Sequence, residues 1–161
     1  MEHWKTYAGA AAATALSAAV GSAAVDADSA WYRSLSKPPW QPPPWAFGAV
    51  WTPLYVSIAW AAGHALSRAR GRRRRALAVG LGVNLTLNTA WTLLFFGRHS
   101  TRAGAVGTVL LDVSNVDLIR RTARVDPSAA RALLPYAAWC AFATALTFDI
   151  ARRNRTSGAG R

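Results

Sequence analysis

Aromatic and basic side chains gather in one proline-rich part of the sequence, between Trp31 and Trp45. This stretch also holds Arg33, Lys37 and Trp40, and the chain of 161 residues contains eight tryptophans in all. Aromatic faces bind flat apolar surfaces, and neighbouring cations attract carboxylates. The pattern therefore predicts a binding site for a flat, anionic and largely apolar molecule.

The sequence holds no arrangement typical of a metal site or of a nucleophilic enzyme. The single cysteine, Cys140, excludes an intrachain disulfide and a cysteine-based zinc site. His3, His64 and His99 lie in three separate segments without ligand spacing. We therefore expect no bound metal and no required cofactor.

Composition indicates a membrane protein. Hydrophobic residues make up 52% of the chain and charged residues only 16%, with 19 Lys and Arg against seven acids and a formal net charge of +12. Basic clusters between long apolar runs are typical of loops in multispanning membrane proteins. Nucleic-acid binding is not expected, because the apolar runs leave no polar face for a basic patch.

Five apolar stretches of about 20 residues, each long enough to cross a bilayer, must position the aromatic residues. They lie at about 6–25, 46–67, 76–97, 103–121 and 132–153. We predict one domain over residues 1–161, an all-α integral membrane bundle of five transmembrane helices, with a lid loop over about 26–45. For the first stretch, Lys5 before an alanine-rich run leaves a cleaved signal peptide as an alternative.

The Lys and Arg residues are divided unequally between the two sides of such a bundle. The side with the N-terminus and the loops at 68–75 and 120–131 carries eleven of them, and the lid side carries eight. The positive-inside rule therefore predicts a cytoplasmic N-terminus. High alanine and arginine usage is typical of a GC-rich bacterial source, so the expected location is a bacterial cytoplasmic membrane.

Polar and aromatic residues share helix faces and depth. Asn84, Asn88, Trp91 and Phe95 are spaced by 4, 3 and 4, which places them on one helix face. Further stripes are Phe47, Trp51, Tyr55 and Ile58 in the second stretch and Trp139, Ala143 and Leu146 in the fifth. At ~1.5 Å rise per residue, six positions lie roughly 8–15 Å below the lid side: Trp51, Tyr55, Asn88, Trp91, Asp112 and Ala143. Trp139 lies deeper, at about 21 Å.

These stripes predict a shared pocket beneath the lid, with two alternatives. Trp51 and Trp91 can instead pack helices together, and Asn88 can join helices by hydrogen bonds. Hydrogen bonding between helices is the preferred interpretation for Asn84. Asp112 inside a membrane span is a functional candidate, or else the partner of a neighbouring polar group.

Taken together, these residues resemble the TspO/translocator protein family, also called tryptophan-rich sensory proteins or peripheral-type benzodiazepine receptors. The similarity covers nearly the whole chain. It rests on Trp31-Tyr32, Leu35, Lys37-Pro38, Trp40, Pro42-Pro43, Phe47, Trp51-Thr52, Leu54-Tyr55, Asn84, Asn88, Trp91, Leu94-Phe95-Phe96, Pro135-Tyr136, Trp139, Phe142-Ala143 and Leu146.

The resemblance implies a retained first helix, a five-helix membrane fold that is often a homodimer, and binding of porphyrins such as protoporphyrin IX and haem-like tetrapyrroles. Arg33 and Lys37 are candidate partners for the porphyrin propionates. The implied ligand-binding residues are Tyr32, Pro42, Trp51, Tyr55, Asn88, Trp91, Asp112, Trp139 and Ala143.

Two alternatives to sensing, handling or transport of a porphyrin stay open. Some relatives degrade protoporphyrin in light and oxygen, which would use Trp51 and Trp139. A structural or partner-binding membrane protein is the other alternative. Sterol binding is not expected, because the recognition pattern near the end of the fifth helix needs a tyrosine and this chain has Phe148 before Arg152.

Overall fold

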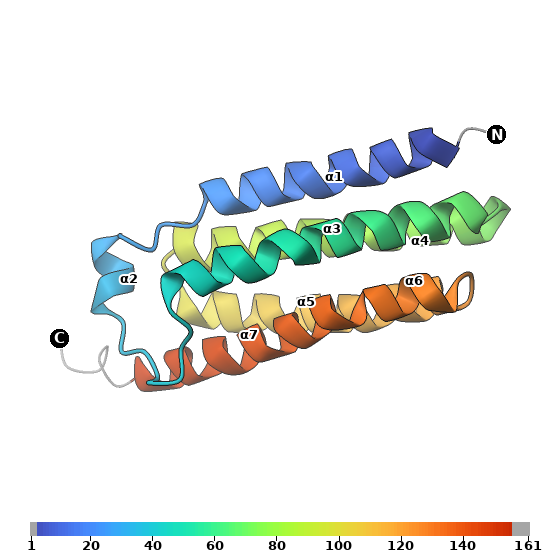
Figure 1. Ribbon diagram of the computed structural model, residues 1–161. Helices are drawn as coiled ribbons and strands as arrows, with labels where there is room; N and C mark the ends of the chain where they lie inside the picture. The colour runs from blue at the N-terminus through green and yellow to red at the C-terminus, as the bar shows by residue number, and fades with distance from the viewer. Residues whose placement is uncertain (1–2, 156–161) are drawn as a thin grey trace.

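Long helices lie side by side in a bundle, and a short helix covers one end of it (Figure 1). The computed structural model describes residues 3–155, which contain helices and no strands. The prediction of an all-α fold is confirmed. The elements are α1 (His3–Ala23), α2 (Ala30–Ser34), α3 (Pro44–Arg68), α4 (Gly71–Thr92), the π-helix η1 (Leu93–Gly97), α5 (Thr101–Ala123), α6 (Pro127–Ala132) and α7 (Leu134–Arg153).

Each of the five predicted stretches contains a long helix, with two differences. The lid region is not all loop, because Ser29 caps the short helix α2 by accepting a hydrogen bond from the Tyr32 amide. The fifth stretch is divided near Leu133, where α6 ends and α7 begins with a proline in its first turn. Proline has no N–H to continue the helical ladder, so a break at this point is expected.

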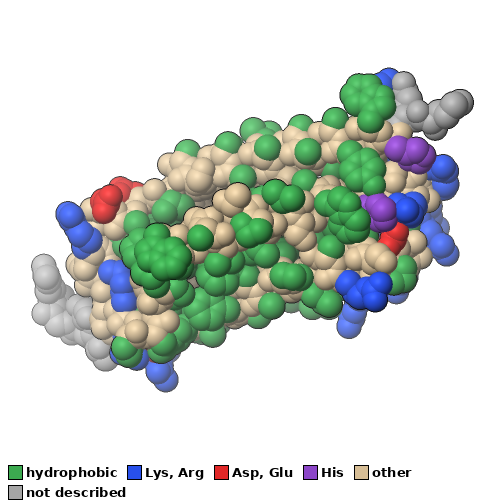
Figure 2. All heavy atoms as spheres, in the orientation of Figure 1, with side chains coloured by type: hydrophobic (Ala, Val, Ile, Leu, Met, Phe, Trp, Pro, Cys, Tyr) green, Lys and Arg blue, Asp and Glu red, His purple; other side chains and the backbone are tan. Residues whose placement is uncertain are grey.

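Two helical segments, Gly71–Gly97 and Pro127–Arg153, are long and apolar enough to cross a membrane. On the face shown in Figure 2, hydrophobic and neutral side chains cover the long side, and charged side chains gather at the two ends. A bilayer places apolar groups along its core and charges at its surfaces, so this distribution suits a membrane protein. Crossing by α1, α3 and α5 stays a prediction.

Small and hydroxyl-bearing residues bring α1 against its neighbours. The buried positions on α1 are Ala10, Thr14, Ser17 and Gly21. The Ser17 hydroxyl donates to the Leu85 carbonyl at 3.1 Å, so α1 is bonded to α4 within the bundle. Gly63 of α3 faces Tyr7 of α1, where a Cβ atom would lie 2.5 Å from the tyrosine ring. Both contacts need small residues for the helices to approach this closely.

A polar cluster closes the end of the bundle opposite α2. His64 stacks on Trp60 and lies 2.7 Å from the Tyr7 hydroxyl through its Nδ1 atom. Its Nε2 atom lies 3.4 Å from Asp126, which also pairs with Arg68 at 3.2 Å. Hydrogen bonds from the backbone amides at the start of α6, with these two basic neighbours, hold the pKa of Asp126 below its ordinary value. The cluster joins α1, α3 and α6.

Candidate functional site

A cavity of about 420 Å³ lies beneath the lid, between α1, α3, α4 and α7. This lid cavity falls within the usual range for small-molecule sites, roughly 300–1,000 Å³. Its aromatic lining comes from the lid, from α3 and from the end of α4 with η1: Tyr32, Phe47, Trp51, Tyr55, Trp91, Phe95 and Phe96. Small residues of α1 and α7, among them Gly21 and Ala143, line other parts of the wall.

The π-helix η1 brings aromatic side chains to the lid. Phe95 and Phe96 are adjacent in sequence, yet both are buried and both line the cavity. Single π-helical turns within α-helices often occur at functional sites. Here the turn lets Trp91 stack on Phe95, with ring centroids 5.9 Å apart, while Phe96 meets the ring of Tyr32 at 5.3 Å. The lid helix therefore rests on η1 through its aromatic residues.

Polar contacts hold the lid in shape. The Lys37 ammonium donates to the Tyr32 carbonyl at 2.6 Å and lies 4.4 Å from the centre of its ring. Gln41 donates to the Tyr32 hydroxyl at 3.2 Å. Burial raises the pKa of Tyr32, although the hydrogen bond from Gln41 acts in the opposite direction. The phenol is therefore neutral at physiological pH, and its proton can be donated within the cavity.

A side-chain amide fastens the lid to the end of α7. The Asn154 Oδ1 atom accepts from the Ser36 amide at 3.0 Å, and its Nδ2 atom donates to the Ser36 carbonyl at 3.0 Å. The Nδ2 atom also donates to the Ile150 carbonyl at 2.7 Å, which fixes the side chain on its own helix. The two residues are 118 positions apart in sequence. This paired contact, the Asn154 latch, is a specific tie between lid and bundle.

A chain of four hydrogen bonds, three of them buried, forms the floor beneath the cavity. Tyr55 donates to Asn88 at 3.4 Å, and Asn88 donates to the Tyr136 hydroxyl at 3.0 Å. Tyr136 donates to Asn84 at 3.0 Å, and Asn84 donates to Asn115 at 2.7 Å. These five residues belong to α3, α4, α5 and α7. Asn84 joins helices, as preferred from sequence, while Asn88 both joins helices and lines the cavity.

Sequence comparison identifies the family of this chain. The profile of the TspO/MBR family matches residues 9–153, which include α1 from Gly9 onward, the other long helices and the lid. The chain belongs to the TspO/MBR family. It is similar to the tryptophan-rich protein TspO of Chlorobaculum tepidum, with 36% identity over 125 residues that cover 77% of this chain and 79% of the relative.

Two further relatives come from distant organisms. The translocator protein of Homo sapiens is 34% identical over 133 residues, covering 81% of this chain and 79% of its own length. Protein CrtK of Rhodobacter capsulatus is 33% identical over 132 residues, which cover 81% of this chain and 82% of CrtK. The family resemblance inferred from the sequence is confirmed, and the protein is a TspO/MBR membrane protein.

The lid cavity brings together six of the nine ligand-binding residues that the TspO/MBR resemblance implied. They are Tyr32, Trp51, Tyr55, Asn88, Trp91 and Ala143. Pro42 is outside the lining, while Gln41 and Pro44 are in it. An extended proline-rich segment has about three residues per turn, so positions 41 and 44 share a side that position 42 does not.

Asp112 and Trp139 also lie outside the cavity lining. Asp112 faces α7 and accepts a hydrogen bond from Thr144 at 2.6 Å. Trp139 stacks on Phe142 and meets Phe47 edge to face, with centroids 5.9 Å apart. Because Phe47 lines the cavity, Trp139 stands behind that wall rather than in it.

The two propionate candidates have different surroundings. Arg33 is exposed on the lid, and Lys37 is occupied by its contacts with Tyr32. Neither lines the cavity. Two lining residues have a buried polar atom without a hydrogen-bond partner among residues 3–155, Gln41 through Oε1 and Trp91 through Nε1. Sequence reasoning missed Gln41. Trp91 was predicted as an aromatic surface, and its free N–H is an additional feature.

Replacement of Asn154 by alanine should loosen the lid, because it removes both hydrogen bonds to Ser36. At a net ~1–2 kcal/mol for the pair, exchange of the Ser36 amide hydrogen should accelerate roughly 5- to 30-fold. Hydrogen exchange with peptide-level mass spectrometry measures this directly. Ser34→Ala is the control, since the Ser34 hydroxyl bonds only within the lid, to Trp31. Equal exchange in Asn154→Ala and the unchanged chain would contradict the latch.

Replacement of Asn84 by alanine should destabilise the bundle, because Tyr136 and Asn115 both lose a buried partner. We expect a loss of about 1–3 kcal/mol in the free energy of unfolding. Denaturant titration of the protein in micelles, followed by circular dichroism, gives this value. Thr86→Ala is the matched control on the same helix, because Thr86 is exposed and bonds only to the Gly82 carbonyl. A similar loss in both variants would show that the floor contributes nothing specific.

Proposed function

We propose that this protein binds a porphyrin or related tetrapyrrole in the lid cavity, for sensing, handling or transport. The observation that carries the proposal is the lining itself, because Trp51 and Trp91, from different helices, both line the cavity beneath Tyr32 of the lid. Large aromatic faces in a water-poor cavity favour a flat conjugated macrocycle. Family membership supports the proposal.

Unpartnered polar atoms fit such a ligand. Trp91 Nε1 can donate to a carboxylate or a ring nitrogen, and Gln41 Oε1 can accept from a pyrrole N–H. Arg33 is the proposed partner of a propionate at the cavity mouth, because its guanidinium is exposed on the lid. Lys37 then acts through the lid, which it holds in shape. The proposal requires no other cofactor and no metal.

The proposed setting is a bacterial cytoplasmic membrane crossed by five helices, with the N-terminus inside. The family is a membrane family, and two segments of this chain qualify as spans by length and composition. The remaining spans, α1, α3 and α5, pack alongside them in the same bundle (Figure 1). We also propose a homodimer as the working form.

Trp51→Phe should weaken porphyrin binding, because Trp51 lines the cavity and stacks on Tyr55 with centroids 5.1 Å apart. Loss of the larger ring should raise the dissociation constant about 5- to 10-fold, on the scale of ~1–1.5 kcal/mol for an aromatic contact. Titration of protoporphyrin IX, followed by its Soret absorbance, measures the change. Trp45→Phe is the control, because Trp45 is 74% exposed. Absence of saturable binding, or equal affinities in both variants, would count decisively against the proposal.

A second candidate is light- and oxygen-dependent degradation of the bound porphyrin. It is favoured by the aromatic path from Trp139 through Phe47 to the cavity that Trp51 lines. We expect Trp139→Phe to slow protoporphyrin loss under illumination while leaving the dissociation constant unchanged, because Trp139 stands behind the wall. Absorbance decay and product chromatography in light and in darkness test this. An unchanged rate in Trp139→Phe would remove Trp139 from the mechanism.

A further inference from the structure

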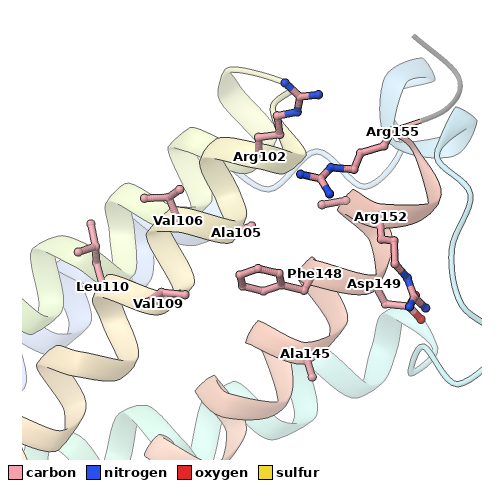
Figure 3. Close-up of a pocket in the computed structure, with 11 residues that line it drawn as sticks. Arg102, Ala105, Val106, Val109, Leu110, Ala145, Phe148, Asp149, Arg152 and Arg155 are labelled. Carbon is pink, nitrogen blue, oxygen red and sulfur yellow. The ribbon is translucent and has the colours of Figure 1, made fainter. Parts of the chain in front are cut away.

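A second hollow, separate from the lid cavity, lies on the outer side of the bundle between α5 and α7 (Figure 3). This outer groove has a volume of about 740 Å³ and shares no lining residue with the lid cavity. Its walls are Val106, Val109 and Leu110 of α5, facing Ala145 and Phe148 of α7. Val106 is 62% exposed and Phe148 50% exposed, so the described chain leaves these apolar walls uncovered.

One end of the outer groove is strongly basic. Arg102 and Arg155 lie at this end, above the apolar walls, and the side chain of Arg152 turns toward Asp149 (Figure 3). The only acid in the lining is Asp149, and its carboxylate already pairs with Arg152 at 3.0 Å and with Arg153 at 3.1 Å. The guanidinium groups of Arg102 and Arg155 have no ion pair or hydrogen bond with any of residues 3–155. Two unpaired cations thus stand at one end of an apolar channel.

The length of the groove matches one leaflet of a bilayer. From Arg102 to Leu110, α5 rises ~12 Å, close to the roughly 15 Å of half a hydrocarbon core. The facing wall belongs to Pro127–Arg153, a segment long and apolar enough to span a membrane. With this segment crossing the bilayer, Arg102, Arg152 and Arg155 lie at the level of lipid headgroups. The apolar walls then face the acyl chains.

We propose that the outer groove binds one anionic glycerophospholipid, with its phosphate on Arg102 and Arg155 and an acyl chain along Val106, Val109 and Phe148. Planar guanidinium groups recognise phosphate oxygens by paired charge-assisted hydrogen bonds. A second copy of the chain fits the groove less well. A two-fold contact would bring the same patch against itself, and so place these arginines against one another.

The test compares two lipids of identical chains, dioleoyl phosphatidylglycerol and dioleoyl phosphatidylcholine, on the full chain in detergent by native mass spectrometry. We expect retained phosphatidylglycerol adducts and few phosphatidylcholine adducts. One basic side chain near an anionic surface contributes roughly five-fold in affinity, so Arg102→Gln with Arg155→Gln should reduce phosphatidylglycerol binding about 25-fold. The control is the double variant Arg72→Gln with Arg73→Gln, which removes the same amount of charge at the start of α4, at the end of the bundle away from the lid. This control should retain most of the phosphatidylglycerol binding.

A second variant tests the walls without changing charge. Ala145→Trp fills the groove from an exposed position, so it should weaken phosphatidylglycerol binding while leaving the fold intact. The proposal would be overturned by equal binding of the two lipids, or by equal losses of binding in the two double arginine variants. It would also be overturned if Ala145→Trp dissociated a dimer without changing the lipid adducts. Protoporphyrin titration of the same variants should be unchanged, so failure of the lipid site and failure of the lid cavity are distinguishable.

Discussion

Buried polar side chains in a membrane bundle must find their hydrogen-bond partners within the protein, because the surrounding hydrocarbon offers none. The chain from Tyr55 through Asn88, Tyr136 and Asn84 to Asn115 supplies such partners across four helices, and among its side-chain amides only the Nδ2 atom of Asn115 has no partner within residues 3–155. Each bond has a fixed direction, so the set restricts how α3, α4, α5 and α7 can rotate against one another. Apolar packing alone would tolerate many rotations. The rotation of these helices determines which side chains line the lid cavity, so the hydrogen bonds of the floor fix the shape of the cavity.

The roof of the cavity is held differently from the floor. Aromatic contacts of Tyr32 with Phe96 and of Trp31 with Phe95 place α2 on η1, and the Asn154 latch fastens the following residues to α7. These contacts are few and partly exposed, whereas three of the four hydrogen bonds of the floor are buried. The lid is therefore expected to open at a lower free-energy cost than the helix packing beneath it.

Three successive residues of α7 face three different environments. Ala143 lines the lid cavity, Thr144 bonds to Asp112 on α5, and Ala145 lines the outer groove. Consecutive residues on a helix point about 100° apart, so one short stretch can serve the interior, a helix contact and the outer surface. Asp112 does not line the cavity, because it faces Thr144 of α7 rather than the cavity side on which Ala143 lies. The depth of a residue in the membrane does not determine the direction in which its side chain points around the helix axis.

Much of this molecule was predictable from local sequence. Apolar runs of membrane-spanning length predicted the long helices, and the 4, 3, 4 spacing of Asn84, Asn88, Trp91 and Phe95 correctly placed them on one inward face. Periodicity could not reveal the π-helical turn that brings Phe96 to the cavity beside Phe95, because that turn breaks the regular period. It also could not place Trp139 behind Phe47, which depends on a contact between α3 and α7.

The sequence by itself determined the all-α class, the long helices and most of the aromatic residues of the site. These features follow from composition and from the spacing of residues a few positions apart. Only the tertiary structure decided which residues face one another. Asn154 meets Ser36 across 118 positions, Gln41 lines the cavity in place of Pro42, and Arg102 comes beside Arg155 at the outer groove. Such pairings depend on how helices rotate and cross, and the hydrogen bonds and packing of the whole bundle fix that geometry together.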